Sequence, residues 1–258
     1  MRALCYAQTN IGSGRDNNED NYYCNGTFKR DPAIPVAEAA AEQESKRLIY
    51  GVFDGMGGEA NGEQAALLCA QTLHACSSDE PFDALDFFRR ANVAVCDMIA
   101  ASGQISGSTA ATVHLTGNHA YCCNVGDSRI YRLRGGRMEQ LTQDHSLVGE
   151  LVRAGILTAE EARTHPRRNI ITRALGTEGD NTPDLLAADL QPGDRFLLCT
   201  DGLTGMVRDD EIERTLLDSQ TADEAADRLI QMALDAGGSD NVTLILCTGE
   251  EGKPWKQD

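Results

Sequence analysis

Between residues 109 and 142, short apolar segments follow one another closely, and this spacing is the strongest constraint on the fold. The strand-like segments are 109–116, 119–125 and 129–133. They are joined by connections as tight as Gly117-Asn118 and Gly135-Gly136. Tight connections join antiparallel strands, because parallel neighbours need a crossover of a dozen or more residues. We therefore expect an antiparallel sheet.

Other segments predict further strands and several helices. Apolar runs bounded by turn signals predict strands at 48–53, 195–199 and 242–247. Apolar residues at three- and four-residue spacing predict helices at 63–75, 84–100, 209–217 and 222–236. Residues 144–176 are a mostly helical excursion that we expect to lie on the sheet as a flap. The stretch 31–46 is expected to be a solvent-exposed insertion that can hold a short helix.

Composition and charge bound the class of protein. Acidic residues outnumber basic ones 40 to 23, and the net charge of −17 argues against binding to nucleic acid or anionic membranes. Neither a signal peptide nor an apolar run of membrane-spanning length is evident. The nine cysteines include no CxxC pair, and several lie inside apolar runs. With no linker or repeat in 258 residues, we expect one soluble domain, 1–258, in a reducing cytoplasm.

Single aspartates stand at the ends of the most apolar strands, next to glycines or turn residues. They are Asp54, Asp127, Asp201 and Asp240. Each alone could make a turn through its own side-chain hydrogen bonds, but four such positions favour a shared role in binding cations. Oxygen ligands without a His/Cys cluster indicate magnesium or manganese rather than zinc. A glycine at position 55 also allows its backbone carbonyl to approach an ion.

Eight sequence blocks, in order, resemble the bacterial form of the PPM, or type 2C, family of metal-dependent protein phosphatases. The blocks are Arg15-Asp16-Asn17-Asn18-Glu19-Asp20, Val52-Phe53-Asp54-Gly55-Met56-Gly57-Gly58, Gly107-Ser108-Thr109-Ala110, Asn124-Val125-Gly126-Asp127-Ser128-Arg129, Leu141-Thr142-Gln143-Asp144-His145, Ile171-Thr172-Arg173-Ala174-Leu175-Gly176, Leu198-Cys199-Thr200-Asp201-Gly202-Leu203 and Gly238-Ser239-Asp240-Asn241-Val242-Thr243. The resemblance spans nearly the whole chain. It implies an α+β fold, a four-layer α-β-β-α sandwich with two central antiparallel sheets and a helical flap.

The resemblance also implies roles for site residues in a cleft at one end of the sheets. Asp54 would bridge two cations, the Gly55 carbonyl would make a second contact, and Asp201 and Asp240 would be further ligands. Asp127 would help to hold a weaker third ion. Glu19 and Asp20 would belong to the metal shell, partly through bound waters. Arg15 would clamp the substrate phosphate, for which its bidentate fork is suited, although alone it could equally pair with Glu19.

The implied activity is hydrolysis of phosphoserine and phosphothreonine on proteins by a water bridging two Mn²⁺ or Mg²⁺ ions. The implied partners are phosphoprotein substrates and a Ser/Thr kinase, and we expect a monomer. Many eukaryotic relatives carry a histidine where this chain has Met56, so no side chain is assigned as general acid. His145 is interpreted as structural, and a metal-bound water as the proton source.

Two alternatives are open to test. The pattern C-x5-R of cysteine phosphatases occurs at Cys24 to Arg30 and at Cys123 to Arg129, but neither match opens a helix that could stabilise a thiolate. A pseudophosphatase that binds phosphoproteins without turnover is the second alternative. Such a protein would be expected to lack a ligand carboxylate, whereas Asp54, Asp201 and Asp240 are all present.

Overall fold

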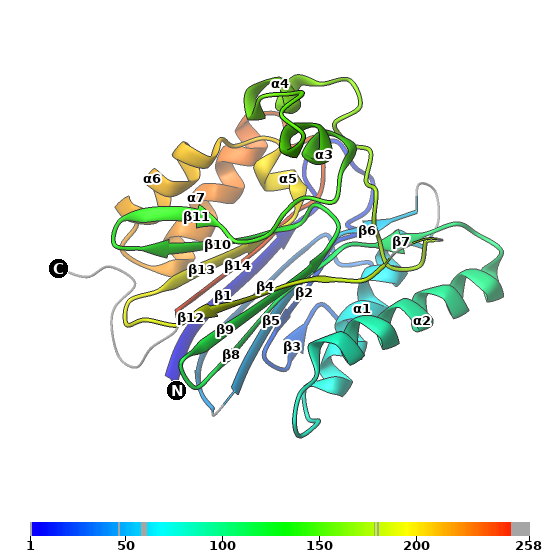
Figure 1. The fold of residues 1–258 in the computed structure, drawn as a ribbon, viewed down its shortest axis with the longest axis horizontal. Coiled ribbons are helices and arrows are strands. Elements are labelled where there is room, and N and C mark those ends of the chain that lie inside the picture. Colours follow the sequence, from blue (N-terminus) through cyan, green and yellow to red (C-terminus); the bar gives the residue numbers. More distant parts are fainter. Residues whose placement is uncertain (1, 46, 58–60, 178, 180, 249–258) are drawn as a thin grey trace.

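A computed structural model describes residues 2–45, 47–57, 61–177, 179 and 181–248. Within these residues, two six-stranded sheets lie face to face (Figure 1). Sheet A has the order β11 (Arg137–Gln140), β10 (Arg129–Arg134), β13 (Arg195–Cys199), β14 (Val242–Thr248), β1 (Arg2–Asn10) and β4 (Val36–Glu44). Sheet B has the order β12 (Asp184–Asp189), β9 (His119–Val125), β8 (Ala110–Thr116), β5 (Arg47–Phe53), β2 (Asn21–Cys24) and β3 (Thr27–Phe28). The neighbouring strands of both sheets pair antiparallel, as the tight connections predict.

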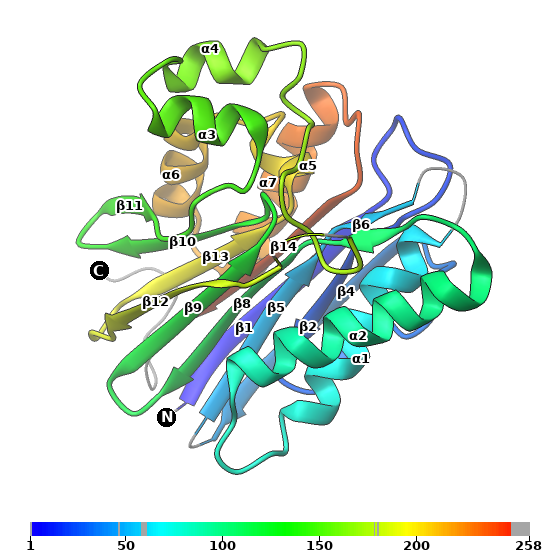
Figure 2. The same cartoon turned by 45° about the vertical axis from the view of Figure 1, so that its right-hand side comes forward.

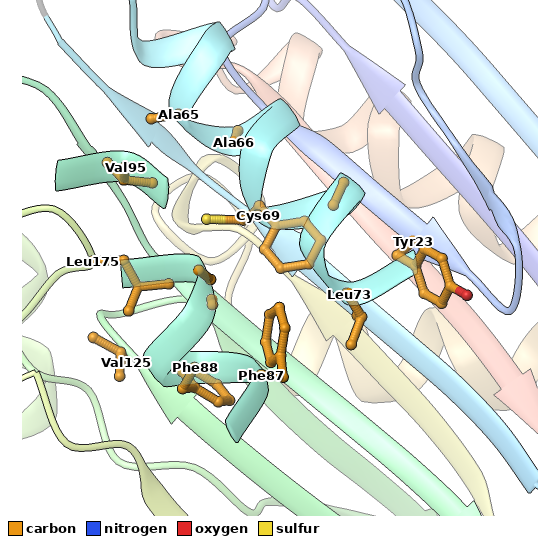
Figure 3. Close-up of a cluster of buried hydrophobic side chains, with 14 of the residues drawn as sticks. Tyr23, Ala65, Ala66, Cys69, Leu73, Phe87, Phe88, Val95, Val125 and Leu175 are labelled. Atoms are coloured by element: carbon orange, nitrogen blue, oxygen red, sulfur yellow. The ribbon is translucent and has the colours of Figure 1, made fainter. Parts of the chain in front are cut away.

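Helices cover the outer face of each sheet, which makes the four-layer sandwich expected from the resemblance (Figures 1 and 2). Helices α1 (Gly62–Cys76) and α2 (Ala84–Ser102) pack on sheet B. Figure 3 shows part of this core, where Phe87 of α2 lies beside Leu73 of α1 and Phe88 lies on the side of Val125. Helices α5 (Asp201–Thr204), α6 (Asp209–Asp218) and α7 (Ala222–Asp235) pack on sheet A.

Alternation of side chains explains how the central strands of both sheets contribute to two cores. Tyr22 of β2 faces the layer between the sheets, whereas the next residue, Tyr23, faces α1. Likewise Leu198 of β13 points between the sheets, and Leu197 points to α6 and α7. Successive side chains of a strand point to opposite faces, so strands that are apolar throughout must be covered on both sides.

The flap lies beyond one end of the sheets and contains helices α3 (Leu147–Arg153) and α4 (Ala159–Thr164). Ser146 caps α3 by accepting from the Gly149 N–H, and Thr158 begins α4 with a capping box that includes Glu161. The two ends of the flap meet in a bridge between Ser146 and Ile171. A two-stranded ribbon of β6 (Gly55–Met56) and β7 (Gly107–Ser108) lies at the same end of the sheets.

The prediction of a short helix within 31–46 is wrong. Residues Val36–Glu44 form β4, which extends sheet A by pairing with all nine residues of β1. Alanine and glutamate favour helices, but Ala37 and Ala39 pack against the core between the sheets, and this tertiary contact overrides local propensity. The structure also joins Cys5 of β1 to Cys24 of β2 in a disulfide, which the sequence did not lead us to expect.

The predicted strands and the four predicted helices are confirmed to within two residues at each end. The expectation that 144–176 is mostly helical is wrong, because α3 and α4 have 7 and 6 residues and the rest of the flap is loop. No helix in the described ranges is both long and apolar enough to cross a membrane.

Candidate active site

Six carboxylate residues gather at the end of the sandwich beneath the flap, and each follows or precedes a strand. Asp54 follows β5, Asp201 follows β13, Asp240 precedes β14, Asp127 lies between β9 and β10, and Glu19 and Asp20 precede β2. In Figures 1 and 2, β6 and the start of α5 lie at this same end. The positions come from both sheets, so packing one sheet on the other brings them together.

Burial and mutual repulsion raise the pKa of several of these carboxylates. Burial, followed by the charges of Asp20, Asp201, Asp127 and Asp240, raises the pKa of Asp54 well above its ordinary value. Burial also raises the pKa of Asp20 to about 7 and that of Asp201 to about 6, although Thr200 hydrogen-bonds Asp20. The cleft therefore holds more negative charge than its environment solvates, which is the electrostatic setting of a cation site.

Glycines allow the loops that carry these carboxylates to touch. A Cβ atom on Gly202 would lie 1.9 Å from the Asn241 carbonyl oxygen, so the turn after Asp201 rests directly on the turn after Asp240. A Cβ on Gly55 would lie 2.1 Å from the Gly62 carbonyl oxygen. Only glycine fits at these two positions, and the glycines that flank the aspartates in the sequence are thus explained by close backbone approach.

Thr109 of the turn into β8 fixes the main chain of Asp54, a role the sequence did not reveal. The Asp54 N–H donates to the Thr109 hydroxyl at 3.1 Å, and the Thr109 N–H donates to the Asp54 carbonyl at 2.9 Å. The same hydroxyl lies 2.7 Å from Ser128 Oγ, next to Asp127. All three residues are in the quoted blocks, but only the fold shows that their strands converge.

Asn241 joins the first loop of the chain to the Asp240 turn. Its side-chain oxygen accepts from the Glu19 N–H at 2.8 Å, and its amide donates to the carbonyls of Ile11 and Asn17. Beneath it, Thr200 donates to the Asp20 carboxylate at 2.8 Å and accepts from the Thr243 N–H. The carboxylates thus rest on a buried, hydrogen-bonded polar layer, which limits their movement.

Arg15 lies at the mouth of the cleft, where one guanidinium nitrogen donates to Asp240 Oδ2 at 2.8 Å. Its side chain remains 45% exposed in spite of this bond. The partner is Asp240, rather than Glu19 as in the surface ion pair considered above. Glu19 instead accepts from the Asn17 side chain at 3.3 Å.

The carboxylate cluster fits divalent cations. Asp127 Oδ1 and Asp201 Oδ1 are buried, and neither meets a donor in the part of the chain that the structure describes. A buried carboxylate oxygen without a donor is costly unless a cation neutralises it. Among the same residues, no three Asp, Glu, His or Cys side chains already close around one point, so the carboxylates form a cluster and not a finished cage. An all-oxygen donor set matches Mg²⁺ or Mn²⁺.

A cavity of about 570 Å³ opens from this cluster toward the flap. It is lined by Asp127 and Asp201 on one side, by Val148 and Arg163 of the flap, and by Arg208 at the start of α6. Arg163 donates to the Thr204 carbonyl at 2.8 Å and so ties the flap to α5. The cavity is large enough for a segment of polypeptide to approach the carboxylates.

His145 and Met56 both make structural contacts near this cluster. His145 is buried with a ring nitrogen against the Gly126 backbone, which agrees with its structural interpretation. Met56 lies in β6 and pairs with Gly107.

Neither C-x5-R match forms a cysteine nucleophile. Cys24 ends β2 and is bonded to Cys5. Cys123 lies within β9, where burial raises the pKa of its thiol to about 12. Arg129 points away from it and binds the Asp144 carboxylate through two nitrogens. A thiolate mechanism needs an exposed, low-pKa cysteine, which neither position provides.

Comparisons with known proteins agree with this geometry. The family model described as "Protein phosphatase 2C" matches residues 6–242. The chain is 34% identical to the serine/threonine phosphatase stp of Listeria innocua over 93% of both chains. It is 36% identical to the serine/threonine protein phosphatase PstP of Mycobacterium tuberculosis over 93% of this chain and 44% of that protein.

Solved structures show the same fold. A crystal structure of the Mycobacterium tuberculosis phosphatase PstP/Ppp superposes with a TM-score of 0.81 at 35% identity, covering 96% of this chain and 100% of that one. A structure of the PstP catalytic domain in complex with two manganese ions has a TM-score of 0.79 at 33% identity, covering 96% of this chain and 99% of the other.

Proposed function

Because the chain belongs to the protein phosphatase 2C family, we propose that its acidic cleft hydrolyses phosphoserine and phosphothreonine on proteins. The supporting observation is the convergence of six carboxylates from both sheets beside one exposed arginine. An inactive, phosphoprotein-binding role has no such support, since no expected carboxylate is missing and the relatives are named phosphatases.

We propose the following roles for the site residues. Asp54, the Gly55 carbonyl, Asp201 and Asp240 would together hold two divalent cations, with Asp54 as the shared ligand. Asp127 contributes to a weaker third position, and Glu19 and Asp20 act partly through waters. When bound, the two cations make a water nucleophilic at neutral pH and neutralise charge on the phosphoryl group.

The chain's own groups orient the reaction. The Thr109 hydroxyl and amide hold the main chain of Asp54, which limits movement of the backbone that carries this carboxylate. Arg15 offers the exposed nitrogens of its guanidinium to two phosphate oxygens, which aligns the phosphoryl group over the carboxylates. The flap cavity receives the polypeptide around the phosphorylated residue.

Several finer assignments belong to the same proposal. Manganese or magnesium is the working cation, supported by the oxygen-only donor set and by the two manganese ions named in the PstP structure. Residues 1–258 act as one catalytic domain and as a monomer in the cytoplasm. A Ser/Thr kinase supplies the phosphorylated substrates. The net charge of −17 supports a protein partner over nucleic acid.

The test is release of phosphate from a phosphothreonine peptide by the purified chain with Mn²⁺. Activity should disappear on chelation, return with added Mn²⁺, and be unaffected by thiol alkylation. Phosphate release that survives chelation, or none at all with Mn²⁺ present, would contradict the proposal.

A further inference from the structure

His145 lies between the hairpin that carries Asp127 and the base of the flap, and only 3% of it is exposed. Its main-chain N–H donates to the Gly126 carbonyl at 2.9 Å. The Gly126 N–H in turn donates to His145 Nδ1 at 3.2 Å. Gly126 is therefore bound twice by the same residue, at its carbonyl by the His145 backbone and at its N–H by the imidazole.

These contacts determine the tautomer of the ring. Since Nδ1 accepts a hydrogen bond, the proton of the neutral imidazole is on Nε2. Nε2 lies 3.3 Å from Asp184 Oδ2 at the start of β12 and 3.4 Å from a guanidinium nitrogen of Arg173. Asp184 Oδ1 accepts from Arg173 at 3.0 Å, so the carboxylate is held by both neighbours. The ring is thus oriented at both nitrogens, as outer-shell histidines often are.

The main chain of His145 also closes the base of the flap. The Thr172 N–H donates to the His145 carbonyl at 2.8 Å, and the Leu147 N–H donates to the Ile170 carbonyl at 2.8 Å. Arg173, which donates to Asp184, comes directly after Thr172, where the chain leaves the flap. The entry and exit of the flap are consequently connected to Gly126 through one residue, His145.

Thr109 also packs closely against Gly126. Gly126 has a φ of +106°, and a Cβ there would lie 2.5 Å from Thr109 Cγ2. Because His145 and Thr109 both hold Gly126, the direction of the next side chain, Asp127, is set. We propose that His145 is a positioning residue that aims the Asp127 carboxylate through Gly126 and links it to the base of the flap. The inference rests on the proposed function, in which Asp127 contributes to a cation position.

Two substitutions separate this role from plain packing. His145→Asn places an acceptor where Nδ1 stood and retains the bond from Gly126, whereas His145→Gln places a donor near Nε2 and retains only the bond to Asp184. Both remove the buried ring. If the ring only fills space, the two variants should behave alike; if it positions Asp127, the Asn variant should resemble the wild type.

The experiment uses the full chain and two readouts other than activity. In the metal-free protein, amide hydrogen exchange at Gly126 should be about tenfold faster in His145→Gln and within about twofold of wild type in His145→Asn. In calorimetric Mn²⁺ titrations, the weakest binding event should lose about tenfold in affinity in the Gln variant only. Equal behaviour of the two variants in both readouts would overturn the inference.

Further variants keep the result interpretable. Asp184→Ala, at the exposed edge of sheet B, removes the carboxylate beside Nε2 but keeps the bond from Gly126 to Nδ1, and should stay within about twofold of wild type in both readouts. Should the Gln variant fail to fold, His145→Phe, which keeps a ring but accepts no hydrogen bond, takes its place, and wild-type behaviour of His145→Phe would overturn the inference. Asp127→Asn tests the underlying assignment: if it leaves Mn²⁺ binding unchanged, the role of Asp127 is wrong. If it weakens Mn²⁺ binding and His145→Gln does not, only the inference fails.

Discussion

Arg15 donates to the Asp240 carboxylate at 2.8 Å, which joins two side chains 225 positions apart in the sequence. The bond uses one terminal nitrogen of the guanidinium and leaves the side chain half exposed at the cleft mouth. The arginine is thereby held beside a proposed cation ligand, with donors still free to face an incoming phosphate.

Replacing Arg15 should weaken transition-state binding of the phosphoryl group. A hydrogen bond to a charged group contributes about 1.5–3 kcal/mol, so Arg15→Ala should lower kcat/KM about 10- to 100-fold. Arg15→Lys should recover only part of this, because an ammonium lacks the planar fork. The measurement is steady-state kinetics on a phosphothreonine peptide. Arg89→Ala, which breaks an exposed ion pair with Asp86 on α2, is the control, and equal effects of the two alanine variants would rule out the clamp.

Removing a carboxylate should abolish turnover and yet stabilise the metal-free fold. Asp54→Asn and Asp240→Asn should each reduce kcat by at least about 1000-fold, because both residues are proposed cation ligands. In chelator, Asp54→Asn should raise Tm by a few degrees, since it deletes one member of a repelling cluster. Activity assays and thermal melts check both, with exposed Asp97→Asn on α2 as the control. Full activity of both site variants would sink the assignment.

The contact between the two aspartate turns should tolerate no side chain. In Gly202→Ala the new Cβ would lie 1.9 Å from the Asn241 carbonyl oxygen, and we expect a loss of at least about 3 kcal/mol in unfolding free energy. Gly117→Ala serves for comparison, because that glycine has a φ of +55° but open space around it, and should lose only about 1 kcal/mol. Urea titrations measure both, and comparable losses would show that steric contact at Gly202 is unimportant.

His114 should make stability fall on the acid side of neutrality. Burial, and next the charge of Arg47, lowers the pKa of His114 from 6.5 to about 4. In the unfolded chain His114 is protonated below about pH 6.5, whereas in the folded chain it stays neutral down to about pH 4. The contribution of His114 to the unfolding free energy is complete above pH 6.5. It declines as pH falls to 4, by about 2 kcal/mol given the partial exposure of the ring.

The check is the difference in unfolding free energy between wild type and His114→Phe from pH 8 to 4. Phenylalanine should keep the ring contacts with Phe82 and Tyr121, whose centroids lie 5.0 and 5.8 Å away. The difference should grow in favour of the variant as pH falls. A constant difference across this range would show that His114 does not titrate on unfolding.

Much of the fold follows from local pattern. Strands β9 and β13 match the predicted 119–125 and 195–199, because apolar residues continuous over both faces leave no other element of that length. The segment at 36–44 was predicted wrongly, because its alanines and glutamates favour a helix while the free edge of β1 is decided by distant residues. Propensity fails here because tertiary pairing is the stronger term.

The candidate site, like the fold, could be predicted only in part from the sequence. The positions of Asp54, Asp201 and Asp240 at strand ends are visible in the sequence, and the structure brings them into one cluster. Thr109 and Asn241 were not singled out, because a hydroxyl or amide acquires its function only from the chain segments it meets. Asn241 bonds residues more than two hundred positions away.

The central place of β14 in sheet A has a consequence for biosynthesis. This strand pairs with β1 on one side and β13 on the other, and Asp240 and Asn241 lie just before it. Most of sheet B can pair from residues that leave the ribosome early, but the cleft has no Asp240, no anchor for Glu19 and no partner for Arg15 until β14 has emerged and inserted. A nascent chain therefore cannot hydrolyse phosphoproteins until translation has passed residue 248. A product truncated before this strand would expose two unpaired strand edges to proteolysis.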